Sequence, residues 1–377
     1  MSILVISFDA IGDKVFEAMA LDSENYPNIA RFKGEAYYRG GVKTVFVSNT
    51  YPIHTSVSTG KLPKDHGVIS NLLPPKKNGE RPWAQMAKYI KTKTIWDAAR
   101  EKNLSTAAML WPVTCGAKID FHMPEVHAEK GQNLLFRSLI YGSVFFQFSA
   151  ILKHGRKLLN ALKGVALGTG LPVLDDFTAA VTCDLLKRKK PDLVLVHLIA
   201  YDTMFHLVGS NGEGMEIAMK AMDTNLGMLL ESWGPHDTVI VFSDHSQFDV
   251  NESLNLNDVY EDIAFEQTGG SAFLNRKPEG LEEQPWFGRY LTKEEMDESG
   301  YGDKPVLGLA AKMGYAFTEG KKYKGNHGYP TDYDNYSVFY CVRGKNFESN
   351  QEQNLLKNHI TDITAIIARE LNLDMGT

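Results

Sequence analysis

Short apolar runs that alternate with helix-like segments place the strongest limit on how this chain can fold. Runs of about four to eight apolar residues are typical of strands that are buried on both faces of a parallel sheet. Three of these runs end beside an aspartate: Ile3–Phe8 before Asp9, Leu193–Ile199 before Asp202, and Thr238–Phe242 before Asp244. Further candidate strands are Thr106–Leu110, which follows the helix-like Thr94–Lys102, then Gly270–Leu274 and Ser337–Cys341. The alternation predicts an α/β fold with a mostly parallel central sheet and helices on both faces.

Two segments depart from this alternation. Residues from His122 to about Leu171 have a helical pattern, and residues from Val250 to about Tyr323 mix charged and glycine-rich pieces with one short apolar strand. No long linker or internal repeat divides the chain. We therefore expect a single domain over residues 1–377, with a helical insertion at 122–171 and a small inserted lobe at 250–323.

Composition and charge exclude several classes of protein. The 377 residues include 40 Lys+Arg and 46 Asp+Glu, so the formal charge is −6, and 43% of the residues are hydrophobic. This predicts a folded globular chain and no binding to nucleic acid, which would require a positive surplus. The three cysteines have no CxxC spacing, and the first apolar run meets Asp9 without a basic leader segment. Both observations favour reduced thiols and a cytoplasmic location.

One apolar stretch deserves comparison with a membrane span. Ser138–Leu152 is shorter than the roughly 17–25 residues that a spanning helix needs, and it contains Gln147. A basic amphipathic part follows it, from Lys153 to about Leu162. The pattern favours a buried or interfacial helix, and peripheral membrane contact through 138–163 is the less favoured alternative.

The candidate site combines aspartates with histidines. Asp202 and His206 are four residues apart and share one face of a helix, Asp244 and His245 follow a strand, and His327 lies in a Gly-Asn-His-Gly turn. Taken one at a time, these residues are explained more simply by helix caps, packed imidazoles and an ordinary turn.

Thr50 adds a possible nucleophile. It precedes a run rich in Thr and Ser, which fits a helix N-terminus that favours an anion. A threonine alcohol becomes a competent nucleophile when a divalent metal holds it. Three Asp, three His and this Thr together form a nitrogen and oxygen ligand set that suits two zinc or similar ions, with manganese as an alternative.

The motifs resemble those of the alkaline phosphatase superfamily and, within it, the nucleotide pyrophosphatase/phosphodiesterase family. Thr50–His54 is similar to the nucleophile motif, and Thr59–Asn71 to the stretch that follows it; three further matches are Tyr201–His206, Ser243–Ser246 and Gly325–Tyr329. The departures from the family pattern are Ile53, Tyr201, Phe205 and Ser246. None of these four is a metal ligand, so they bear on the shape of the substrate pocket.

The resemblance implies a role for each matched residue. One metal ion would be held by Asp202, His206 and His327, and the other by Asp9, Asp244, His245 and the Thr50 oxygen. Thr50 would attack phosphorus and form a phospho-threonine that is then hydrolysed. Asn71 would donate its side-chain amide to a phosphoryl oxygen. Tyr51 matches a position that stacks on the leaving group, and Trp111 would either line the same pocket or pack in the core.

These expectations favour a hydrolase of phosphodiester or nucleotide pyrophosphate bonds that acts on a small molecule. A phosphomonoesterase of this superfamily needs an Arg to hold the phosphate dianion, and the sequence has none next to Thr50 or Asn71. The alternatives are a phosphonate hydrolase of the phosphonoacetate type and, more remotely, a non-catalytic binding protein that keeps the fold.

Overall fold

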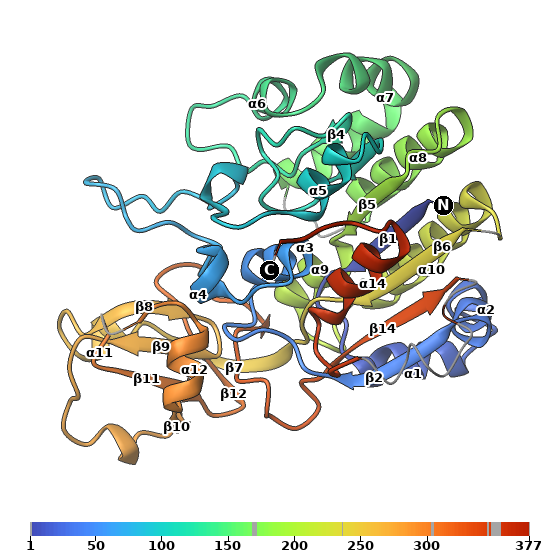
Figure 1. Ribbon diagram of the computed structural model, residues 1–377. Coiled ribbons are helices and arrows are strands. Elements are labelled where there is room, and N and C mark those ends of the chain that lie inside the picture. The colour runs from blue at the N-terminus through green and yellow to red at the C-terminus, as the bar shows by residue number, and fades with distance from the viewer. Residues whose placement is uncertain are drawn as a thin grey trace.

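A seven-stranded sheet forms the centre of the molecule in the computed structural model (Figure 1). The structure describes residues 2–167, 172–235, 237–302, 305–344, 347 and 356–376. In spatial order the strands are β2 (Tyr37–Val42), β14 (Val338–Arg343), β6 (Thr238–Ser243), β1 (Ile3–Phe8), β5 (Leu193–Leu198), β3 (Thr106–Met109) and β4 (Phe121–Met123). Every strand predicted for this sheet is present, with ends within one or two residues of the predicted bounds.

The sheet is mostly parallel, as predicted. β1 lies between β5 and β6 and is parallel to both, and β3 is parallel to β5 and β4. β14 instead runs antiparallel to β6 and β2, so the expectation that Ser337–Cys341 continues the parallel alternation is wrong. The chain reaches β14 from His327, which lies at the end of the sheet where β6 terminates. No crossover helix carries the chain back to the end of the sheet where β6 begins, so β14 must run in the direction opposite to β6.

Both faces of the sheet are covered, because successive strand residues point to opposite sides. Leu4 and Ile6 of β1 belong to one hydrophobic cluster, and Ile3 and Val5 to the other. Helices that pack in the first cluster are α1 (Asp13–Leu21), α2 (Pro27–Glu35), α8 (Val173–Arg188), α9 (Ala200–Val208) and α10 (Met215–Trp233). Helices that pack in the second are α3 (Thr50–Thr59), α5 (Ile95–Glu101) and α14 (Asp362–Glu370).

The segment at 122–171 is mainly helical. It contributes β4 at the edge of the sheet and then forms α6 (Leu134–Tyr141) and α7 (Val144–Leu167), which lie at the top of the view in Figure 1. His154 has non-helical backbone angles and divides α7 into two parts. Gly168–Leu171, the end of the predicted insertion, lie outside the described residues. Among the described helices, none combines the length and the apolar character that crossing a bilayer would require.

The segment at 250–323 contains a second sheet with its own hydrophobic cluster, at the lower left of Figure 1. Its strands, in spatial order, are β10 (Phe287–Tyr290), β11 (Leu307–Ala311), β9 (Ser271–Leu274) and β8 (Ala264–Thr268). A small third sheet is formed by β12 (Gly314–Phe317), β7 (Phe248–Leu254) and β13 (Gly325–Asn326). Short helices complete the described structure: α4 (Pro63–His66), η1 (Ala87–Tyr89), α11 (Leu256–Val259), η2 (Leu281–Glu283) and α12 (Lys293–Glu298).

Candidate functional site

Three aspartates meet at the carboxyl edge of the central sheet. Asp9 follows β1, Asp244 follows β6, and Asp202 lies in the first turn of α9, just beyond β5. These three strands are neighbours in the sheet and run in the same direction, so their ends meet at one edge. Ligands of parallel α/β sheets bind at this edge. The register of β1 thus explains how residues more than two hundred positions apart come together.

Asp9, Asp244 and His245 form one cluster of possible ligands. Their side-chain ligand atoms lie within 4.8 Å of one another, and all three residues are buried. His245 Nε2 is 3.3 Å from Asp9 Oδ1 and 3.4 Å from Asp244 Oδ2. The other oxygen of Asp244 accepts the backbone N–H groups of Ala10 and His245 at 3.0 and 2.9 Å, which fixes the orientation of the carboxylate.

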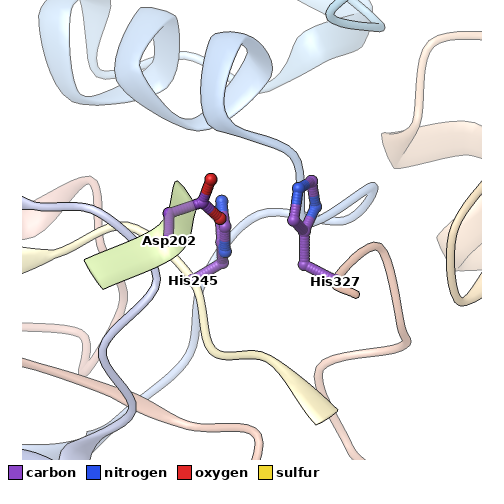
Figure 2. Close-up of side chains that lie close together, drawn as sticks. All are labelled: Asp202, His245 and His327. Carbon is purple, nitrogen blue, oxygen red and sulfur yellow. The ribbon is translucent and has the colours of Figure 1, made fainter. Parts of the chain in front are cut away.

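Asp202, His245 and His327 form a second cluster, again with ligand atoms within 4.8 Å of one another. Figure 2 shows the Asp202 carboxylate and the His327 ring on either side of His245. His206 stands beside this cluster, with its Nε2 atom 3.3 Å from Asp202 Oδ1 and its ring centroid 5.2 Å from that of His327. The structure therefore brings all the predicted Asp and His residues together, and it adds His245 to the group that contains Asp202 and His327.

The three histidines present the same nitrogen to the site. A backbone carbonyl can only accept a hydrogen bond, so a ring nitrogen bonded to one carries the proton, and the other nitrogen keeps its lone pair for a ligand. In each ring Nδ1 is the bonded atom. The acceptors are the carbonyls of Gly325 for His206 (2.7 Å), Ser48 for His327 (3.2 Å) and Ser246 for His245 (3.3 Å). Burial, together with His245 and His206, also lowers the pKa of His327 well below its usual value, which keeps that ring neutral.

The residues at this end of the sheet are suited to hold divalent cations. Within the described part of the chain, Asp9 Oδ1 and Asp244 Oδ2 are buried oxygens without a hydrogen-bond donor. Burial and the nearby Asp244 and Asp202 raise the pKa of Asp9 well above its usual value. Burial also acts to raise the pKa of Asp244, but His245, His54 and His197 lower it. Unpaired carboxylate oxygens that repel one another in a buried site are what bound cations would stabilise.

Thr50 begins helix α3 at the rim of this site. Its hydroxyl lies 3.3 Å from His245 Nε2, and its side chain lines the pocket above the aspartates. Asn71 lines the same pocket, and its side-chain oxygen accepts the backbone N–H of Tyr51 at 2.8 Å. This bond leaves the Asn71 amide nitrogen available as a donor.

The beginning of α3 is held by His54, one turn after Thr50. Burial and His197 lower the pKa of His54 to about 3, so the ring is neutral. Its Nδ1 atom lies 2.9 Å from the Thr50 carbonyl and its Nε2 atom 2.9 Å from the Ser7 hydroxyl, which ties the helix to β1. The Nε2 atom of His197 is 3.1 Å from Asp9 Oδ2, so His197 contacts a candidate ligand of the first cluster.

The pocket has a volume of about 290 Å³ and an aromatic wall. Tyr51 lines it together with Trp83 and His127, whose rings stack with centroids 3.7 Å apart. Sequence reasoning missed Trp83 and His127, because they lie in loop segments with no local pattern that links them to Thr50. Lys321 is a further lining residue and brings a positive charge to the pocket.

Trp111 lies elsewhere. Its side chain is fully buried in the second hydrophobic cluster, and the indole N–H donates to the Ser58 hydroxyl at 3.0 Å. It is not among the residues that line the pocket. Of the two alternatives predicted for Trp111, the structure shows the position in the core. The polar N–H group of the indole can be buried there because Ser58 accepts its hydrogen bond.

A second, mostly apolar cavity of about 200 Å³ adjoins the first. The two share Glu125, His127 and Ile199 as lining residues, and α6, α7 and the start of α8 form much of the apolar wall. The segment at 122–171 thus lies beside the pocket that contains Thr50.

Known structures share this fold at low sequence identity. Murine ectonucleotide pyrophosphatase/phosphodiesterase 5 superposes with a TM-score of 0.67 and 18% identity over 100% of this chain and 96% of that one. Phosphonoacetate hydrolase from Sinorhizobium meliloti 1021 superposes with a TM-score of 0.64 and 16% identity, over 98% of this chain and 95% of that one. These similarities establish the fold.

Sequence comparison identifies the family. Venom phosphodiesterase of Macrovipera lebetinus is 20% identical over 369 residues, which cover 88% of this chain and 39% of that protein. Bis(5'-adenosyl)-triphosphatase ENPP4 of Pongo abelii is 30% identical over 122 residues, which cover 30% of this chain and 25% of that protein. The chain spans about two fifths of the length of the venom enzymes that it matches. The family model of type I phosphodiesterases and nucleotide pyrophosphatases matches residues 3–287, and the chain belongs to this family.

Proposed function

We propose that this chain is a metal-dependent hydrolase that cleaves phosphodiester or nucleotide pyrophosphate bonds with Thr50 as the nucleophile. The observation that carries the proposal is the position of the Thr50 hydroxyl. It lies 3.3 Å from Nε2 of His245, a residue that belongs to both clusters of candidate ligands. Thr50 is the first residue of helix α3. Family membership supports the same reaction class.

Two divalent ions would be held at the edge of the sheet, and zinc fits the nitrogen and oxygen donors best, with manganese as the alternative. Asp202, His206 and His327 would hold one, and Asp9, Asp244, His245 and Thr50 the other. Bound there, the ions would supply positive charge that activates the Thr50 oxygen and stabilises the phosphoryl group. His245 lies close enough to both groups of candidate ligands to orient them relative to each other.

The reaction would have two steps. The Thr50 hydroxyl would lose its proton as its oxygen forms a bond to phosphorus, and the leaving group would depart as its bond to phosphorus breaks and take up a proton. Water then cleaves the phospho-threonine and regenerates the Thr50 hydroxyl. Asn71, whose oxygen is held by the Tyr51 backbone, would donate its amide nitrogen to a non-bridging phosphoryl oxygen.

The aromatic wall favours a leaving group or nucleoside with a flat ring. Tyr51, Trp83 and His127 line one pocket with Thr50, and an aromatic surface of this kind can stack with a base. A murine relative with the same fold has been solved in complex with AMP. We therefore propose a small nucleotide or an aromatic phosphodiester as the substrate.

Phosphonate hydrolysis is the second candidate. Lys321 lines the pocket and can pair with the carboxylate of a substrate such as phosphonoacetate. The solved phosphonoacetate hydrolase has the same fold. A direct comparison of bis-p-nitrophenyl phosphate, p-nitrophenyl phosphate and phosphonoacetate separates the candidates, and we expect the diester to be turned over with the highest kcat/KM. Preference for the monoester would contradict the diesterase proposal.

Thr50→Ala tests the nucleophile. The variant removes the attacking oxygen without opening a core cavity, so we expect kcat for bis-p-nitrophenyl phosphate to fall by at least about a thousandfold, with unchanged circular dichroism. Thr55→Ala is the matched control, because its hydroxyl is also buried in α3 but, among the described residues, donates to the Tyr51 carbonyl within the helix and contacts no candidate ligand. Retained turnover in Thr50→Ala would refute the role of this residue.

We also propose a cytoplasmic location, which the three buried, unbridged cysteines support. Cell fractionation with an antibody against the chain would test it, and recovery from the medium would contradict it.

A further inference from the structure

Helices α6 and α7 expose an unusual number of large apolar side chains. Six of the exposed residues are Phe136 and Ile140 in α6 and Val144, Phe145, Phe148 and Leu152 in the first part of α7; Leu159 and Leu167, in its second part, are exposed as well. Phe145 is 93% exposed and Leu152 is 73% exposed. Val144, Phe145, Phe148 and Leu152 follow the spacing i, i+1, i+4, i+8, which places them on one face of the helix. We call these four residues, with Phe136 and Ile140, the apolar face.

The same two helices are strongly basic, in contrast to the rest of the chain. Residues 134–167 contain no Asp or Glu, although the chain as a whole carries a net charge of −6. Their cations are Arg137, Lys153, Arg156, Lys157 and Lys163. Lys153 pairs with Asp184 of α8. Arg156, Lys157 and Lys163 are exposed, and no ion pair involves them in the part of the chain that the structure describes.

We propose that the apolar face and the neighbouring cations dock on an anionic lipid bilayer. Amphipathic helices with Phe and Leu on one side and Lys or Arg beside them lie in the plane of the membrane interface, where apolar side chains enter the headgroup and acyl boundary. The cations are attracted to the lipid phosphates, and each adds to the affinity. The proposed contact is peripheral, with the helices lying on the bilayer surface. No helix among the described residues is long and apolar enough to cross a membrane.

Charge decides between a membrane and a second copy of the chain as the occupant. A symmetric dimer through this face would bring the same patch of each copy together. It would then set two basic surfaces without acidic residues against each other, which is unfavourable. An anionic bilayer has the opposite charge and covers the exposed Phe side chains at the same time.

Vesicle co-sedimentation tests the proposal. We expect the protein to bind phosphatidylcholine vesicles that contain phosphatidylglycerol, to bind pure phosphatidylcholine vesicles at least about tenfold more weakly, and to lose affinity as salt rises. The double variant Phe145→Ser/Phe148→Ser should bind the anionic vesicles at least about tenfold more weakly, since it removes two exposed aromatic side chains of the apolar face. Arg156→Ser/Lys157→Ser should show a loss of similar size and a weaker salt dependence.

Matched controls separate this effect from a general loss of surface hydrophobicity or of the fold. Leu21→Ser, at the end of α1, removes a side chain that is 85% exposed on another helix, and its binding should be unchanged. None of the substituted residues lines either cavity, so turnover of a soluble diester should remain that of the wild type in every variant. Wild-type binding by the Phe variant would overturn the proposal. So would a failure of the wild type to bind anionic vesicles, or a Phe variant that changes only the oligomeric state in sedimentation velocity.

Discussion

His245 is the residue on which the geometry of the candidate site depends most. Its Nε2 atom lies 3.3 Å from Asp9 Oδ1, 3.4 Å from Asp244 Oδ2 and 3.3 Å from the Thr50 hydroxyl. The same ring is 4.2 Å from that of His327, measured between centroids. One imidazole thus connects both clusters with the proposed nucleophile, whereas the sequence motifs assign it to a single metal ion.

Gly325 supports this site through its lack of a side chain. A Cβ atom at this position would lie 2.0 Å from Phe205 Cδ1, so a larger residue would have to displace the Phe205 ring or the backbone at Gly325. The Gly325 carbonyl accepts the hydrogen bond that orients His206. Gly325 therefore links the packing of Phe205 to the orientation of a candidate ligand.

We predict that Gly325→Ala lowers metal content and reduces kcat/KM by about ten- to a hundredfold, the range found when partners that orient metal ligands are lost. Gly320→Ala is the control, because nothing lies within 4 Å of its added Cβ. If the clash with Phe205 is the cause, adding Phe205→Ala should restore part of the activity. Wild-type metal content in Gly325→Ala would contradict this explanation.

At the scale of elements, the position of α9 depends on α8. Asp175 in the first turn of α8 is buried, and its two oxygens accept the backbone N–H groups of Ile199 and Ala200 at 3.0 and 2.9 Å. These groups lie at the start of α9, which carries Asp202 and His206. A carboxylate in one helix therefore satisfies the free N–H groups of the next.

Burial raises the pKa of Asp175 to about 7; the two backbone N–H donors act to lower it, and Asp176 acts to raise it. A carboxyl group with a raised pKa in the folded state stabilises that state below its unfolded pKa of about 3.9, and this contribution is lost as the pH rises through about 7. We predict that the free energy of unfolding of the wild type, relative to Asp175→Asn, falls by on the order of 2 kcal/mol between pH 5 and pH 8. Urea denaturation of both proteins at the two pH values measures this difference. A difference that stays constant or grows with pH would show that burial does not raise this pKa.

At the scale of the whole molecule, the candidate metal centre exists only in the folded chain. Its aspartates directly follow β1 and β6 or lie in α9, and its third histidine lies in the connection between β13 and β14. An ion that binds the native state and not the unfolded chain stabilises the fold by mass action, by about 2.7 kcal/mol at a hundredfold excess over Kd.

We therefore predict about two divalent ions per chain after expression with zinc, a lower Tm after treatment with a chelator, and recovery of Tm and turnover when zinc is added back. Asp9→Asn/Asp244→Asn, which removes two buried negative charges, should bind less metal and lose most of the chelator effect. The proposed centre would be refuted if the protein contained no metal after zinc-supplemented expression and its Tm did not change on treatment with a chelator.

The sequence by itself determined the α/β architecture and predicted the Asp, His and Thr residues that the structure brings together at one end of the sheet. Strands buried on both faces must be apolar throughout, so β1, β5 and β6 could be recognised from local composition, and the polar residues that end them had to meet at one edge of a parallel sheet. Only the tertiary structure decided the direction of β14, the pairing of β2 and β4, and the contacts of Trp83, His127 and Trp111. It also decided that His245 lies between both clusters. These features depend on contacts between segments far apart in the chain, and such contacts cannot be predicted from local periodicity and spacing.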